Sequence, residues 1–212
     1  MVINNKIAVI GAGGHAGVVI SAILEAGLEI GGIFDDNPTR HGTEILGHKV
    51  LGSPEIISDL GFQKAIIAIG DNRTRYQVAQ RFPNLCWQTI VHPRSYLHHN
   101  VKIGVGSIVM VNAVIRLNAI IGDHVIVNTG AVVEHECVVE SYAHIAGSVH
   151  LGGECYIHEG AFMGLGVVAV PGTCVGAWSI VGAGATVTKN ISSYTLAVGV
   201  PAKPKKSLSG SA

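Results

Sequence analysis

An apolar residue recurs at every sixth position of this chain from residue 91 to residue 187. A second, mostly small track follows four residues behind the first. An α-helix would need a period near 3.6 residues, and a simple hairpin sheet would show turn signals at irregular strand ends, so a strict period of six excludes both. The period instead predicts a hexapeptide parallel β-helix, in which each hexad forms one short strand and one corner. The main track comprises Val91, Leu97, Ile103, Val109, Ile115, Ile121, Val127, Val133, Val139, Ile145, Leu151, Ile157, Met163, Ala169, Val175, Val181 and Val187.

Three such hexads close a triangular coil, so that residues one coil apart stack directly on each other. The main track then points to the axis of the prism, and the narrow axis requires the second track to be small. Cys137 and Cys155 fall one above the other on that second track, and we expect buried thiols there rather than a disulfide or a metal pair. Each coil contacts only its neighbours, so any chemistry must come from the residues at the corners.

The N-terminal part follows a different pattern. Residues 6–10 form an apolar, β-branched run that ends in Gly11-Ala-Gly-Gly-His-Ala-Gly17, and a helical pattern follows at 18–26. Between a strand and a helix, this glycine spacing aims backbone N–H groups and a helix N-terminus at a phosphate. Gly13, Gly14 and His15 are therefore candidate nucleotide-binding residues. The alternative is that the glycines only close a tight turn and that His15 is an ordinary helix N-terminal residue.

Two further strands are predicted, at 29–34 and 65–69. The first ends in Asp35 and Asp36, at the distance where an acidic residue commonly meets a ribose or base, and the second runs into Gly70. Between these strands the pattern predicts a loop and a short helix capped by Ser53, and after them a helix that reaches Arg81. The ends of parallel strands meet at one sheet edge, so we expect these loops and the glycine loop to form one site for a nucleotide-bearing ligand.

The chain therefore divides into an α/β half-Rossmann domain at 1–88 and a parallel β-helix with a C-terminal tail at 89–212. Three strands alternating with helices make about half of a dinucleotide fold, enough for one mononucleotide. A complete NAD site would need the second half, so an NAD-binding oxidoreductase is a weaker alternative. In the tail, the lysines at 203, 205 and 206 could lie near a donor phosphate or belong to a frayed solvated end.

Composition limits the kinds of partner that we expect for this protein. The 212 residues include 14 basic and 14 acidic side chains, and this balance gives no electrostatic footprint for nucleic acid. Only 13% of residues are charged while 48% are hydrophobic, which favours a subunit interface. No apolar run is long enough to insert into a membrane, and no N-terminal leader pattern occurs. The four cysteines show no framework spacing, which fits a reducing cytoplasm.

One corner of the predicted β-helix carries candidate chemistry. Val133 points inward, so Glu134, His135 and Glu136 lie on or beside a corner, where packing does not call for a histidine between carboxylates. A carboxylate beside an imidazole fixes its tautomer, as a general base requires. His144 could reach the same groove. The alternative is that His135, His144 and the two glutamates are solvated corner residues. We interpret His98, His99, His124, His150 and His158 in that way. No histidine and carboxylate set has ligand spacing, so no metal is expected.

Several motifs carry a resemblance that spans nearly the whole chain. They are Gly11-Ala-Gly-Gly-His15, Phe34-Asp-Asp36, Ile69-Gly-Asp-Asn-Arg73, Asn128-Thr-Gly with Val133-Glu-His-Glu-Cys137, and Val198-Gly-Val-Pro-Ala-Lys203. With these motifs the chain resembles the left-handed β-helix nucleotide-sugar N-acetyltransferases of bacteria, of the bacillosamine type, to which sialic acid O-acetyltransferases are related.

The resemblance implies a homotrimer that uses acetyl-CoA as the acetyl donor. It implies an active site in the groove between neighbouring coils, where His135 is the base, Glu136 orients it, and a backbone N–H at Gly153, one coil above His135, stabilises the oxyanion. It places His144, Leu165 and Ala183 around acetyl-CoA, although the family often has glycine where Ala183 stands. The residues that would bind the nucleotide sugar are Gly13, Gly14, His15, Asp35, Asp36 and Gly70.

The implied reaction is acetylation of the 4-amino group of a nucleotide-linked 4-amino-4,6-dideoxy sugar for surface glycan biosynthesis. UDP is the favoured nucleotide. The alternatives are O-acetylation of a sialic-acid-like sugar, the oxidoreductase mentioned above, and a β-helix that only binds a ligand.

Overall fold

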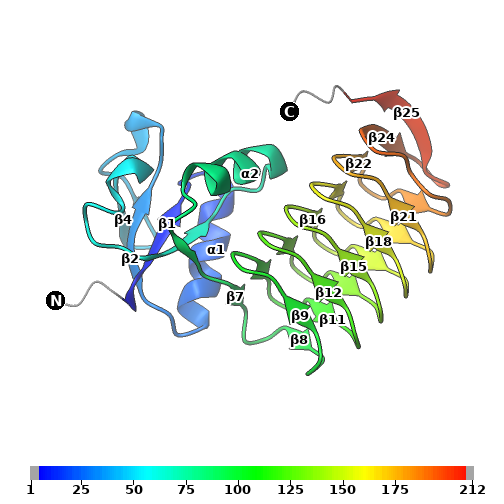
Figure 1. Cartoon of the computed structure of the whole chain (residues 1–212), viewed down its shortest axis with the longest axis horizontal. Coiled ribbons are helices and arrows are strands. Elements are labelled where there is room, and N and C mark those ends of the chain that lie inside the picture. The colour runs from blue at the N-terminus through cyan, green and yellow to red at the C-terminus, as the bar shows by residue number, and fades with distance from the viewer. Residues whose placement is uncertain (1–4, 209–212) are drawn as a thin grey trace. The chain divides into compact units, whose positions relative to one another are not determined.

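The structure, a computed structural model, describes residues 5–208 and contains two compact units, one up to Pro93 and one from Arg94 (Figure 1). The first unit is an α/β domain and the second is a β-helix. The division follows Pro93, whereas the sequence pattern placed the boundary after residue 88. Each unit is described separately below.

The α/β unit contains one six-stranded sheet with the strand order β3-β4-β2-β1-β5-β6. All neighbours run parallel except the β3–β4 pair, which is antiparallel. The strands are β1 (Ile7–Ile10), β2 (Ile30–Phe34), β3 (Glu44–Ile45), β4 (His48–Gly52), β5 (Lys64–Ile67) and β6 (Cys86–Trp87); β7 (Ile90–Val91) follows and contacts α1. The helices are α1 (Gly14–Glu25) and α2 (Asn72–Arg81), with the short 3-10 turns η2 (Pro38–Arg40) and η3 (Pro54–Ile56).

Hydrophobic periodicity explains the central elements of this unit. All four residues of β1 are buried, as expected for a central parallel strand, and α1 buries Ala16, Val19, Ile20 and Ile23 on one face. The helix begins at Gly14, four residues before the apolar pattern, so the glycine loop itself supplies its first turn. The pattern missed β4, which was predicted as loop, because this strand buries only Val50 and Gly52.

The β-helix consists of two-residue strands that form three sheets, and two longer strands, β24 (Thr195–Val198) and β25 (Lys203–Ser207), follow at its C-terminal end. Within this unit, sheet I contains β10 (Ile108–Val109), β13 (Ile126–Val127), β16 (His144–Ile145), β19 (Phe162–Met163), β22 (Ile180–Val181), β24 and β25. Sheet II contains β8 (Tyr96–Leu97), β11 (Val114–Ile115), β14 (Val132–Val133), β17 (His150–Leu151), β20 (Val168–Ala169) and β23 (Thr186–Val187). Sheet III contains β9 (Lys102–Ile103), β12 (Ile120–Ile121), β15 (Val138–Val139), β18 (Tyr156–Ile157) and β21 (Cys174–Val175).

The predicted inward track and its stacking are confirmed. Val133, for example, pairs with Leu151 in the next coil, and both are fully buried. The chain passes from sheet III to sheet I to sheet II within each coil, so the prism has a III–I, a I–II and a II–III corner. Cys137 and Cys155 are buried free thiols that donate to the carbonyl oxygens of Gly152 (3.1 Å) and Val170 (3.4 Å).

The sequence interpretation of one corner histidine is wrong, and the structure narrows the alternatives for the tail. His124 was taken as a solvated corner residue, but only 3% of its surface is exposed, and its ring stacks on Tyr142 with centroids 5.2 Å apart. This corner position has a positive φ at His124 and Tyr142, which lays successive aromatic rings on each other. The tail is not frayed where it is described, because β25 pairs antiparallel with β24. Neither helix in residues 5–208 is long and apolar enough to cross a membrane.

Candidate functional site

The predicted nucleotide-binding loops of the α/β unit meet in one cavity of about 320 Å³ at the carboxyl edge of its sheet. Five of the six predicted residues line this cavity: Gly13, Gly14, His15, Asp35 and Gly70. Asn37 and Arg40 line it too, and the sequence pattern did not single them out.

The glycine loop leaves space and backbone donors for an anion. Gly13 is the N-cap residue of α1 and offers no side-chain cap to the first N–H groups of the helix. A Cβ added at Gly13 or Gly14 would meet nothing within 4 Å, so the backbone borders open space. Because uncapped N–H groups at a helix N-terminus attract negative charge, this loop is suited to a phosphate.

Asp35 ties two of the loops together. Its Oδ2 accepts a hydrogen bond from the backbone N–H of Ala12 (2.6 Å), and its Oδ1 accepts one from that of Asn37 (2.8 Å). The carboxylate therefore positions the glycine loop and the loop after β2 next to each other, at one wall of the cavity.

His15 and Arg75 order the other wall. Burial lowers the pKa of His15, and the charge of Arg75 lowers it further, so the imidazole is neutral at pH 7. Arg75 is fully buried and donates to the carbonyl oxygens of Ile69 and Gly70, each at 3.1 Å, and to Asn72 Oδ1 at 2.9 Å. A fully buried arginine among backbone carbonyls fixes the loop after β5, which no hydrophobic pattern could reveal.

Arg40 is the cationic side chain in the lining of this cavity. It ends η2, whose N-cap Asn37 accepts from the backbone N–H of Thr39 at 3.0 Å, and its Nη1 donates to the carbonyl oxygen of Ala12. A guanidinium beside uncapped helix N–H groups is suited to binding a diphosphate. The sequence pattern missed Arg40 because it lies in a segment predicted as plain loop.

Asp36, the sixth predicted residue, does not line the cavity. Its carboxylate pairs with the guanidinium of Arg81 at 2.7 and 2.9 Å, and Glu55 pairs with the same guanidinium. The hydrogen bond from Arg81 is the main cause that lowers the pKa of Asp36. Asp36 therefore anchors the loop after β2 to the end of α2.

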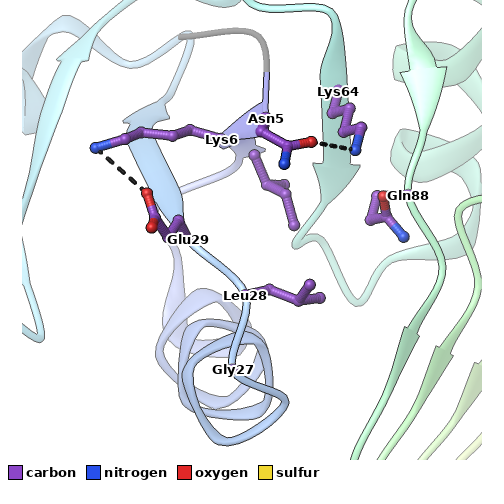
Figure 2. A pocket seen from close by; sticks show the side chains of 8 residues that line it. Asn5, Lys6, Gly27, Leu28, Glu29, Lys64 and Gln88 are labelled. Carbon is purple, nitrogen blue, oxygen red and sulfur yellow. Dashed lines mark hydrogen bonds and ion pairs between the residues drawn. The ribbon is translucent and has the colours of Figure 1, made fainter. Parts of the chain in front are cut away.

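A larger cavity, of about 510 Å³, lies at the opposite, amino edge of the same sheet (Figure 2). Both lysines that line it are paired with other lining residues. Lys64 donates to Asn5 Oδ1 at 2.8 Å, and Lys6 forms an ion pair with Glu29 at 3.6 Å. Ligands of open parallel sheets bind at the carboxyl ends of the strands, so the smaller cavity is the better candidate despite its size.

In the β-helix, His135 lies at the II–III corner next to Gly153. Its Nδ1 is 3.3 Å from Glu136 Oε2, and about half of its side chain is exposed. A Cβ added at Gly153 would lie 2.5 Å from Nε2 of His135. Gly153 does not have the positive φ that would call for glycine, so the imidazole ring itself is what excludes a side chain there.

His144 lies elsewhere on the prism, on the outer face of sheet I. It is 7% exposed, its ring meets Phe162 edge to face at 5.2 Å, and its Nε2 is 3.2 Å from Asn128 Nδ2. Because an amide nitrogen only donates, Nε2 accepts this hydrogen bond and Nδ1 carries the proton. Asn128 had been quoted as part of a motif but given no role.

Leu165 and Ala183 stack one coil apart at the I–II corner. Leu165 is 63% exposed, and an added Cβ at Gly147, one coil below it, would lie 3.3 Å from its Cδ2. The predicted residues of the β-helix therefore form two groups on opposite sides of sheet II. One group, His135, Glu136 and Gly153, is at the II–III corner; the other, His144, Leu165 and Ala183, is on sheet I and at the I–II corner.

One chain does not bring these two groups together. One side of a coil has about six residues at about 3.3 Å each, so the corners that flank sheet II are roughly 20 Å apart. The expectation that His144 reaches the groove of His135 is thus not met within a single chain. Among residues 5–208, no cluster of three or more His, Cys, Asp or Glu side chains is placed to hold a metal ion.

Known proteins resemble this chain over both of its units. Residues 6–82 match the family model of the PglD N-terminal domain. PerB of Caulobacter crescentus, solved with CoA and GDP-perosamine, is 35% identical, with a TM-score of 0.90 over 95% of this chain and 97% of that one. The acetyltransferase domain of PglB from Neisseria gonorrhoeae, solved with acetyl coenzyme A, is 33% identical, with a TM-score of 0.89 over 95% of this chain and 100% of that one.

The matches to curated sequences are shorter. Protein L142 of Acanthamoeba polyphaga mimivirus is 36% identical over 104 residues, which are 46% of this chain and 20% of the viral protein. This chain spans only about a fifth to a quarter of the length of the curated relatives it matches.

Proposed function

The chain belongs to the left-handed β-helix nucleotide-sugar N-acetyltransferases, and on that premise we propose that it transfers the acetyl group of acetyl-CoA to the 4-amino group of a nucleotide-linked 4-amino-4,6-dideoxy sugar. The observation that carries this proposal is the packing of His135 against Gly153, with Glu136 at the far side of the ring. In this proposal His135 is the base, Glu136 is the orienting carboxylate and the backbone N–H of Gly153 is the oxyanion donor.

In this proposal Glu136 sets the tautomer of His135. When Nδ1–H donates to Glu136 Oε2, the Nε2 lone pair is free to accept a proton from the sugar amine as that amine attacks the thioester carbonyl. The backbone N–H of Gly153 would stabilise the tetrahedral oxyanion, and collapse of this intermediate would expel CoA thiolate. A preorganised oxyanion donor contributes about 3 to 4 kcal/mol, and a positioned base about 10²- to 10⁴-fold in rate.

The acceptor nucleotide would occupy the cavity of the α/β unit. Its diphosphate would contact the N–H groups of Gly13, Gly14 and His15, with Arg40 as counter-charge. Asp35, Asn37 and Gly70 would shape the rest of the pocket. UDP is the nucleotide we favour; GDP is the second candidate, because the related PerB structure contains GDP-perosamine.

Acetyl-CoA would bind along the I–II corner. The exposed Leu165 and the neighbouring Ala183 would contact the pantetheine arm, and the Nδ1–H of His144, oriented by Asn128, would donate to the thioester carbonyl. Since this corner lies across sheet II from His135, the proposal requires a second subunit, and we expect a homotrimer in which each site is shared. All four cysteines are free thiols, which supports a reducing cytoplasmic setting. We expect the acetylated sugar to serve surface glycan biosynthesis, as the resemblance to the family implies.

The test is release of CoA thiol from acetyl-CoA with a panel of UDP-, dTDP- and GDP-linked 4-amino sugars. A single panel member should raise the rate far above the acceptor-free background, and mass spectrometry of the product should find one acetyl group on nitrogen. The matched control is the same nucleotide sugar with a hydroxyl in place of the 4-amino group. Equal rates with the hydroxyl sugar would contradict N-acetylation, and absence of thiol release with every member would contradict the proposal as a whole.

A further inference from the structure

A second histidine and carboxylate pair of the β-helix lies at the III–I corner, away from His135. Tyr156 and Cys174 are register neighbours on the outer face of β18 and β21, and Glu140 and His158 follow β15 and β18 at the start of the III–I corner. His158 was taken as a solvated corner histidine, but it bridges two of these side chains. Its Nδ1 is 3.2 Å from Glu140 Oε2 and its Nε2 is 3.9 Å from Cys174 Sγ.

The carboxylate of this cluster is held firmly. Glu140 accepts hydrogen bonds from the Tyr156 hydroxyl (2.6 Å) and from the backbone N–H of Glu159 (2.9 Å), besides the contact with His158. Burial raises the pKa of Glu140, but these hydrogen bonds outweigh it and keep the pKa below its usual range. An ionised Glu140 keeps the proton of His158 on Nδ1, so Nε2 is left to accept a proton from the Cys174 thiol.

Cys174 differs from the other cysteines of the β-helix. Cys137 and Cys155 are fully interior, where a small side chain is required and their thiols donate to backbone carbonyls. Cys174 lies on the outer face, partly exposed, at a position where the preceding coils carry Ile120, Val138 and Tyr156. Interior packing therefore does not require a cysteine at this position.

A nucleophile within reach of a base, with the base oriented by a third group, is the arrangement that activates a thiol for acyl transfer. We propose that Cys174, His158 and Glu140 form a nucleophilic thiol site, separate from His135, that accepts an acyl group from an acyl thioester. The acyl donor rests on the function proposed above.

The chemistry balances without a further reactant. The thiol proton of Cys174 passes to His158 Nε2 as sulfur attacks the thioester carbonyl. The carbon–sulfur bond to CoA then breaks, and the departing thiolate takes the proton from His158. The products are S-acetylated Cys174 and free CoA.

The first arm of the test needs no CoA. The whole protein is treated with limiting iodoacetamide at pH 7, and alkylation of each cysteine is followed by mass spectrometry. Cys86, an exposed free thiol in the same chain, is the internal reference. Cys174 should react about tenfold faster than Cys86, His158→Asn should bring the two rates together, and Glu140→Gln should give an intermediate rate. A Cys174 that reacts no faster than Cys86 would overturn the site.

The second arm uses acetyl-CoA without an acceptor sugar. A hydroxylamine-sensitive acetyl group should appear on Cys174 in the wild type and in His135→Ala, but not in Cys174→Ser. Its absence from the wild type, or its loss in His135→Ala, would overturn the proposal. Cys174→Ser should keep full thiol release with the amino sugar, and this measurement separates failure of the thiol site from failure of the proposed function.

Discussion

The two units of this protein assemble candidate site residues in different ways. In the α/β unit, residues far apart in sequence, Gly13, Asp35 and Gly70, line one cavity within a single chain. In the β-helix, His135 and His144 are nine positions apart in the sequence and lie on different sides of the prism. Closeness along the chain therefore predicts proximity poorly in both units, for opposite reasons.

The physical difference lies in the connections. Parallel strands with helical crossovers deliver every strand end to the same sheet edge, so loops converge there. In a solenoid, an outward residue meets its neighbours in the chain and the residues one coil above and below. His135 therefore meets Glu136 and Gly153 but nothing across the prism. A β-helix that needs both corners for one reaction has to obtain the second corner from another subunit.

The largest effect is expected for His135→Ala. Because its side chain is half exposed on the outside of the prism, its removal leaves no core cavity and should change the free energy of unfolding by no more than about 0.5 kcal/mol. Loss of the base should lower kcat by about 10² or more, with little change in the KM for acetyl-CoA. Steady-state kinetics and thermal unfolding check both parts. Near-normal turnover would show that another group is the base.

Gly153→Ala should be the next most harmful change. Its backbone φ is acceptable for alanine, but the new Cβ would overlap the His135 ring and push it away from Glu136. We expect kcat to fall about tenfold to 10²-fold, because a misplaced base loses most of its advantage. Gly147→Ala, at a glycine of the I–II corner, is the control. Its new Cβ would lie 3.3 Å from the Leu165 side chain, which is a much weaker overlap than at Gly153. Equal losses in kcat for the two variants would contradict the explanation that Gly153→Ala acts by displacing the His135 ring.

Mixing two inactive variants tests the shared site directly. His135→Ala and His144→Ala subunits, unfolded together and reassembled, should form some sites with both histidines intact. For random assembly of a symmetric trimer, about a quarter of the sites should recover. Each variant reassembled alone is the control. If light scattering finds a stable monomer, or if the mixture stays as inactive as its components, the site does not bridge subunits.

The sequence predicted the β-helix and its inward track almost residue by residue, because a period of six leaves no choice of register. It also predicted the strand ends of the α/β unit, and five of the six residues predicted to bind the nucleotide sugar line the cavity there. It missed β4, which buries too little to show alternation, and Arg75, whose burial depends on backbone carbonyls of the loop after β5. His124 and His158 were misread because a corner histidine looks the same in sequence whether it is solvated, stacked or hydrogen-bonded.

Arg40→Gln should weaken acceptor binding about tenfold, because the lining of the cavity loses a positive charge that faces the proposed diphosphate. Affinity for acetyl-CoA should not change, since that ligand would contact the other unit. Isothermal titration with each ligand separates the two. Lys64→Gln, at the cavity on the opposite sheet edge, is the matched loss of charge and should leave both affinities intact.

The smallest effect is expected for Asp36→Ala, because Asp36 anchors its loop through Arg81 and does not line the cavity. The pair is partly exposed, so its loss should cost about 0 to 1 kcal/mol of stability. The pKa of Asp36 is lowered in the folded state, so this contribution is present at neutral pH and disappears as the pH falls through that lowered pKa.

Acceptor affinity should fall only a few-fold, because Arg40 and Asn37 sit on the loosened loop but remain in place to bind. Arg81→Gln removes the same ion pair from the other side and should reproduce the loss. If Asp36 instead contacted the nucleotide itself, Asp36→Ala would weaken acceptor binding tenfold or more while Arg81→Gln would not, because only the first change would remove a group that touches the ligand.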